Sequence, residues 1–117
     1  MKIYTKKGDK GETRLLYGDA VSKDSIAPEA YGSVDELVAA LGLVRYEQKL
    51  PLEAKEYILQ IQRQLFVVGA ELATSKDNRT KLKPNETLVT DSMVETVSYT
   101  HLRAHETLRY SVCRHLL

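Results

Sequence analysis

Apolar residues recur at helical spacing over the segment 28–50. They step by three and four residues and therefore share one face of a helix. They are Ala30, Tyr31, Val34, Leu37, Val38, Leu41 and Val44. Pro28 suits the first helical turn, where its missing N–H costs nothing, and Pro51 disfavours helical angles at Leu50. The pattern predicts one long helix.

A second helix is predicted over 52–73, and its apolar residues form two stripes. The first stripe steps by three and four, as in packed antiparallel helices, and comprises Ile58, Ile61, Leu65, Val68 and Leu72. The second comprises Leu59, Phe66, Val67, Ala70 and Ala73. A helix that is apolar on two faces must be covered by several neighbours. We therefore expect a helical bundle, or partner subunits, rather than a two-helix hairpin.

The rest of the chain contains loops and one further helix. The polar stretch 74–81 and the segment 83–85 are loops by composition. A third helix is expected to begin at Asp91 or Ser92, because Ser92 and Glu95 have the spacing of a capping box. The sequence has no alternating strand pattern of useful length. We predict an all-α, up-and-down helical bundle.

Composition narrows the function classes. The 117 residues suffice for one domain, and 43% apolar with 28% charged residues argues against global disorder. A net charge of +1 gives no electrostatic case for nucleic acid or an anionic membrane. No apolar run approaches the ~18 residues of a membrane span, and 1–7 lacks the apolar core of a secretory signal. Cys113 is the only cysteine, so we expect a cytoplasmic protein without disulfides.

The glycine-containing segment 5–13 carries the candidate chemistry. Gly8 and Gly11 allow positive φ and close approach to a ligand, and successive N–H groups then form an anion-binding concavity. Hydroxyls and ammonium groups that suit phosphate are those of Thr5, Thr13, Lys6, Lys7 and Lys23. The Walker A pattern is absent. A Gly-Asp-x-Gly segment is more often a plain turn, so residue types alone leave both interpretations open.

Six blocks of the chain follow one another in a distinctive order. They are Tyr-Thr-Lys-Lys-Gly-Asp-Lys-Gly-Glu-Thr at 4–13, Val-Ser-Lys-Asp at 21–24, Glu-Ala-Tyr-Gly-Ser-Val-Asp-Glu-Leu at 29–37, Leu-Gly at 41–42, Gln-Arg-Gln-Leu-Phe at 62–66 and Gly-Ala-Glu-Leu-Ala-Thr at 69–74. Together they resemble the N-terminal half of the PduO-type corrinoid adenosyltransferases (ATP:cob(I)alamin adenosyltransferases). The resemblance covers roughly residues 2–96, and its specificity comes from several blocks at the right intervals.

The resemblance implies a fold, a reaction and partners. The fold is a five-helix bundle, here truncated, that assembles as a homotrimer with ATP between adjacent subunits. The reaction transfers the 5′-deoxyadenosyl group of ATP to the cobalt of reduced cobalamin or another corrinoid and releases triphosphate, with Mg²⁺ accompanying the ATP. Because Co(I) is the nucleophile, no nucleophilic side chain is required. The protein would position its substrates and neutralise charge.

The resemblance also assigns residues. Those matching ATP-contacting or loop-shaping positions are Thr5, Lys6, Lys7, Gly8, Asp9, Gly11, Thr13, Arg14 and Lys23. Lys23 matches a lysine on the triphosphate. Asp35 matches an acid that pairs with an arginine across the subunit boundary, and its alternative is a solvated helix carboxylate. No catalytic side chain and no metal ligand are implied within the chain.

The family's second half has no counterpart in this chain. An apolar Phe-x-Leu-Pro-Gly-Gly-type segment, an Arg-Arg-Ala-Glu-Arg-type helix and an Asn-Arg-Leu-Ser-Asp-type helix are missing. Residues 97–107 instead look like a translated sequencing-adaptor read. We therefore expect 1–96 to be the N-terminal part of the domain, 97–117 to be a non-native tail, and the chain alone to lack full activity. His101 and His105 stand four apart, but without a third ligand we expect no metal site there.

Two other interpretations remain. The chain could be a non-catalytic interaction module that docks partner helices on the first apolar stripe of the second helix, at 58–72. It would then bind no nucleotide. It could also be an unstable fragment, for which unfolding would be non-cooperative.

Overall fold

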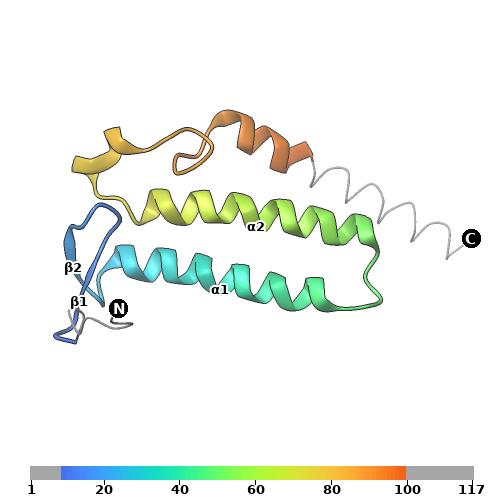
Figure 1. The fold of residues 1–117 in the computed structure, drawn as a ribbon, viewed down its shortest axis with the longest axis horizontal. Helices are drawn as coiled ribbons and strands as arrows, with labels where there is room; N and C mark the ends of the chain where they lie inside the picture. The colour runs from blue at the N-terminus through green and yellow to red at the C-terminus, as the bar shows by residue number, and fades with distance from the viewer. Residues whose placement is uncertain (1–8, 100–117) are drawn as a thin grey trace, which may run out of the picture.

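Two long antiparallel helices form the body of the molecule, and a small hairpin lies at one end of the pair (Figure 1). The computed structural model describes residues 9–99. Helix α1 spans Ile26–Tyr46 and α2 spans Leu52–Leu72, with 21 residues each, so each is about 32 Å long at 1.5 Å per residue. The two predicted helices are confirmed, and with them the mostly helical fold class.

Helix α1 begins and ends earlier than its apolar pattern indicates. Ser25 is the N-cap residue, so the helix starts two residues before Pro28. At the other end Glu47 leaves helical geometry with ψ 119°, and its carboxylate accepts the N–H of Lys49 at 3.1 Å. The N–H of Leu50 then donates to the carbonyl of Glu47 at 3.2 Å. This turn, rather than Pro51, ends the helix at Tyr46.

The hairpin consists of β1 at Glu12–Arg14 and β2 at Ala20–Ser22, and it corrects the expectation of a chain without strands. The strands are antiparallel, with Thr13 opposite Val21. Gly18 adopts φ +95° in the turn between them, a conformation that glycine adopts readily. Strands of three residues are too short to produce a recognisable alternation, which is why the sequence pattern does not reveal them.

The segment after α2 is more ordered than its composition indicates. Residues Lys76–Lys81 form the short 3-10 helix η1, where the polar stretch predicted a loop. Residues 91–99 are helical, which confirms the third helix beginning at Asp91. In Figure 1 this helix, drawn in orange, runs beside α2. Val68 of α2 and Met93 of the third helix line a small hollow of about 220 Å³ between the two.

A polar contact joins α1 and α2 near the middle of the pair. The side chain of Gln62 is only 7% exposed, accepts a hydrogen bond from Arg45 Nη1 at 2.7 Å and donates to the carbonyl of Val38 at 3.0 Å. Towards the hairpin, Gly69 faces Val34, and a Cβ at position 69 would stand 3.9 Å from a methyl group of Val34, an ordinary van der Waals distance. The polar contacts of Gln62 thus join the two helices.

The apolar core of residues 9–99 is shallow. Its buried apolar residues are Leu15, Val67 and Leu82, each 8% exposed, and α1 contributes none. Phe66 is 67% exposed. The predicted 58–72 stripe is half-buried for most of its length rather than open. This agrees with the expectation that α2 requires more neighbours than α1 alone. Within the described residues, no helix is both long and apolar enough to cross a membrane.

Candidate functional site

The hairpin carries most of the predicted nucleotide-binding residues that the structure describes. Thr13 and Arg14 belong to β1, while Gly11 precedes β1 and Lys23 follows β2. The N–H of Lys23 donates to the carbonyl of Gly11 at 2.9 Å, so these two positions, twelve apart in the sequence, lie side by side. Asp9 is exposed in the turn before β1. The remaining predicted positions, Thr5, Lys6, Lys7 and Gly8, lie outside the described residues.

The backbone at Gly11 explains why a glycine stands there. Its φ is +82°, and a Cβ built at this position would meet nothing within 4 Å. The requirement is therefore conformational and not one of space, because L-residues with a side chain rarely adopt this φ. The left-handed turn leads the chain into β1 and positions the carbonyl of Gly11, which accepts the N–H of Lys23. The sequence-based interpretation of Gly11 as a loop-shaping residue has this physical basis.

The two β1 candidates face opposite sides of the hairpin. Arg14 is exposed, and its Nη1 donates to the carbonyl of Gly18 at 2.7 Å, which braces the hairpin turn. Thr13 is half-buried, as expected from the alternation of side chains along a strand. Lys23 is exposed beside Gly11. Lys23 and the backbone around Gly11, at the open end of the hairpin, could contact an anion such as a polyphosphate, whereas Arg14 lies at the turn end beside Gly18.

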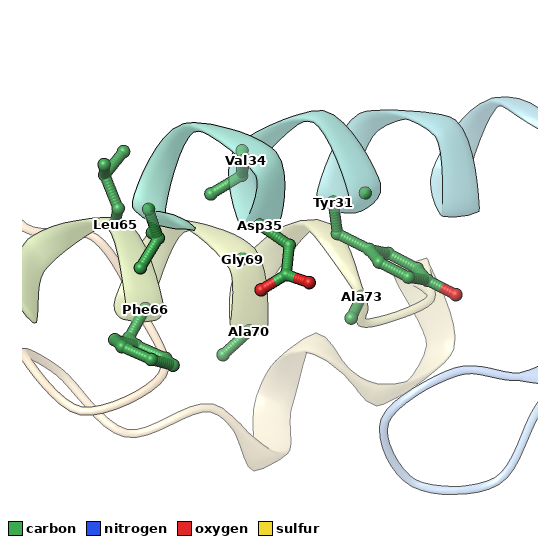
Figure 2. A pocket seen from close by; sticks show the side chains of 10 residues that line it. Tyr31, Val34, Asp35, Leu65, Phe66, Gly69, Ala70 and Ala73 are labelled. Atoms are coloured by element: carbon green, nitrogen blue, oxygen red, sulfur yellow. The ribbon is translucent and has the colours of Figure 1, made fainter. Parts of the chain in front are cut away.

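Asp35 lies in a different place, in a groove between α1 and α2. It is nine residues from the start of α1 at Ile26, roughly 13 Å along the helix axis. The groove is open, measures about 410 Å³, and Figure 2 shows the exposed Asp35 carboxylate on the same side of the helix pair as the rings of Tyr31 and Phe66. Small residues on α2, among them Ala70, create the space. The groove suits an apolar side chain together with one cation.

A polar cluster at the turn of the hairpin was not predicted from the sequence. Asp19 Oδ2 accepts hydrogen bonds from the hydroxyl of Ser75 and from Asn78 Nδ2, the latter at 2.6 Å. The partners are 56 and 59 residues away in the chain. The only available signal was an aspartate after Tyr-Gly in a turn, and such a signal does not name its partners.

A second cluster, around Glu71 near the end of α2, was also missed. Its carboxylate accepts Arg79 Nη2 at 2.8 Å and the N–H of Val89 at 2.9 Å. The Val89 N–H first, and then the Arg79 guanidinium, lower the pKa of the Glu71 carboxyl below its ordinary value of about 4.5. Glu71 thereby ties η1 and the segment before the third helix to α2. Among residues 9–99, no group of three or more potential metal ligands comes together.

Comparisons with known proteins bear on the family of this chain. The family model described as cobalamin adenosyltransferase matches residues 3–110. A corrinoid adenosyltransferase of Citrobacter freundii is 45% identical over 82 residues, which cover 70% of this chain and 46% of the relative. A corrinoid adenosyltransferase of Bacillus subtilis strain 168 is 43% identical over 76 residues, covering 62% and 39%.

A solved structure is similar as well. A variant of the PduO-type ATP:corrinoid adenosyltransferase from Lactobacillus reuteri, complexed with cobalamin and ATP, superposes with a TM-score of 0.62 at 35% sequence identity. The similarity covers 70% of this chain and 45% of that one. The chain thus spans less than half the length of these relatives. With the matched family model and the shared helical fold, the chain belongs to the cobalamin adenosyltransferase family.

Proposed function

We propose that this chain is the N-terminal part of an enzyme that transfers the 5′-deoxyadenosyl group of ATP to the cobalt of a reduced corrinoid. In this reaction Co(I) attacks C5′ of ATP, the C5′–O bond breaks, and triphosphate leaves with the bonding electrons. The supporting observation is that Gly11, Arg14 and Lys23, which match family ATP positions, lie on one hairpin. Membership of the family supplies the reaction class.

In this proposal, the described residues bind and orient the triphosphate. A backbone hydrogen bond of 2.9 Å holds Lys23 beside Gly11, so the backbone that carries its exposed side chain is fixed in position. The Arg14 guanidinium has further N–H groups besides the one that donates to Gly18. Both cations would offset the charge that triphosphate carries as it leaves. Mg²⁺ would arrive with ATP, held chiefly by phosphate oxygens and water.

We further propose that the complete protein is a homotrimer with ATP at the subunit boundary, and that Asp35 pairs with an arginine of the neighbouring subunit. The support is the exposed carboxylate in an otherwise largely apolar groove, beside an exposed Phe66. Such surfaces are costly to leave open. Because the chain spans less than half of its relatives, further helices and neighbouring copies would cover them. A cytoplasmic location stays a prediction, as does the lack of full activity in this chain alone.

The alternative of a helical interaction module receives less support. It requires an open 58–72 stripe, and most of that stripe is half-buried. The end of the family's part at residue 96 also stays a prediction, since the family model matches up to residue 110.

Calorimetry with Mg·ATP tests the proposed function. The chain is expected to bind, and Lys23→Ala should weaken binding by about tenfold or more, because a charge-assisted hydrogen bond is lost. Lys49→Ala is the matched control, since Lys49 is exposed in the turn at the opposite end of the helix pair. The absence of binding heat, or equal losses in both variants, would contradict the proposal.

A further inference from the structure

The hairpin is fastened to the helices through its turn. The N–H of Leu16 donates to the carbonyl of Ala73, just after α2, at 2.8 Å. The neighbouring Leu15 is one of the few buried apolar residues in the described part of the chain. Gly11 and Lys23 stand at the other end of the hairpin, beyond the two short strands. Their position relative to α1 and α2 therefore depends on how firmly the turn is held.

Asp19 is at the centre of that attachment. Its Oδ2 accepts hydrogen bonds from Ser75 and Asn78, which flank and belong to η1, and its carbonyl accepts the N–H of Leu15 at 2.7 Å. One residue thus closes the hairpin turn and links it to η1. Hydrogen bonds to an ionised carboxylate are about twice as strong as neutral ones. This makes Asp19 the strongest single polar link between the hairpin and η1.

The segment that receives Asp19 is itself held in place. Arg79 of η1 bonds to Glu71 of α2 at 2.8 Å. Tyr17 of the hairpin donates its hydroxyl to the carbonyl of Lys81 at 3.0 Å, and the Lys81 ammonium lies 5.3 Å from the centre of the Tyr17 ring. A continuous set of contacts therefore runs from α2 through η1 to the hairpin.

We propose that Asp19 is a positioning residue for nucleotide binding, because its carboxylate, through Ser75 and Asn78, holds the hairpin in the orientation that presents Arg14 and Lys23. This inference rests on the proposed function. The physical reason is that two strands of three residues are only marginally stable alone. Fixing them on the helices in advance lowers the ordering cost that binding would otherwise carry.

The proposal and simple electrostatics predict opposite signs. Asp19 carries a negative charge on the element proposed to bind an anion. Removing that charge removes Coulomb repulsion of the triphosphate, and this effect alone should strengthen ATP binding. Removing an anchor should weaken it. Asp77, exposed on η1, provides the matched control, because Asp77→Ala deletes the same charge from the adjoining segment while leaving Asp19, Ser75 and Asn78 in place.

The test measures Mg·ATP affinity by calorimetry for the unaltered chain and three variants. Asp19→Ala should weaken binding about tenfold, and Ser75→Ala, which removes one of two donors, about threefold. Asp77→Ala should leave affinity unchanged or slightly raised. If Asp19→Ala binds ATP as tightly as Asp77→Ala, the proposal is overturned.

Amide hydrogen exchange provides a readout that does not depend on ATP. In Asp19→Ala, the Leu16 amide should exchange faster while amides in the middle of α1 keep their rates. Equal acceleration throughout α1 and α2 would mean that Asp19 stabilises the whole fold, and this would refute a positioning role. If the unaltered chain binds no ATP, the proposed function fails, whereas the exchange rates still decide whether Asp19 anchors the hairpin.

Discussion

Replacing Gln62 with alanine should destabilise the chain through the contact between α1 and α2. The Gln62 side chain is almost fully buried and joins Arg45 Nη1 at 2.7 Å to the carbonyl of Val38 at 3.0 Å. The first of these hydrogen bonds involves a charged group, which adds about 1.5–3 kcal/mol, and the second is neutral, at about 1 kcal/mol. Because Arg45 can turn towards water, we expect a net loss of about 2 kcal/mol.

Urea unfolding followed by circular dichroism measures this loss as a lower midpoint at an unchanged slope. Gln60→Ala is the matched control, since Gln60 lies on the same helix and is exposed. The control should change the free energy of unfolding by less than about 0.5 kcal/mol. If the two substitutions had the same effect, the view that Gln62 joins the helices would be refuted. A non-cooperative transition in the unaltered chain would instead favour the unstable-fragment interpretation.

Two further predictions concern backbone conformation and pH. Gly11→Ala should lower the free energy of unfolding by about 1 kcal/mol, because φ is +82° at this position. Gly32→Ala lies within α1, where the new Cβ would have nothing within 4 Å, and should raise the free energy of unfolding by up to about 1 kcal/mol. Urea titrations measure both changes. Since folding lowers the pKa of Glu71, its carboxylate adds stability above pH about 4.5 that is lost as pH falls through the folded-state pKa. Unfolding of Glu71→Gln should accordingly depend less on pH as the pH falls below about 4.5, and an unchanged profile would contradict the contacts of Glu71 with Val89 and Arg79.

The helices could be predicted because their signal is local. Apolar residues at three- and four-residue spacing place α1 and α2 within a few residues of their observed bounds. The end of α1 was misplaced, since the side chain of Glu47 caps a turn that periodicity does not encode. The third helix was located to within a residue, but its start lies before Ser92: the helix begins at Asp91, and the N–H groups of Met93 and Val94 donate to the carbonyl of Thr90.

The site was less predictable because its contacts are distant in the sequence. Residue types in the glycine-containing segment 5–13 favoured a plain turn over a phosphate loop, and only the family resemblance favoured the second. The attachment of the hairpin depends on Asp19 meeting Ser75 and Asn78 across more than 50 residues, and no pattern within the hairpin indicates it. The groove around Asp35 is lined by side chains of both helices, small ones of α2 such as Ala70 and the larger Tyr31 of α1, so it depends on a pairing that the sequence pattern does not give.

The central claim is that the hairpin holds the triphosphate of ATP. A titration of the ¹⁵N-labelled chain with Mg·ATP, followed by nuclear magnetic resonance, tests it most directly. We predict that the amide signals of Gly11, Thr13 and Lys23 shift together in a saturable manner while that of Lys49, at the opposite end of the helix pair, stays in place. Shifts confined to the groove around Asp35, or none in the hairpin at saturating nucleotide, would contradict the account.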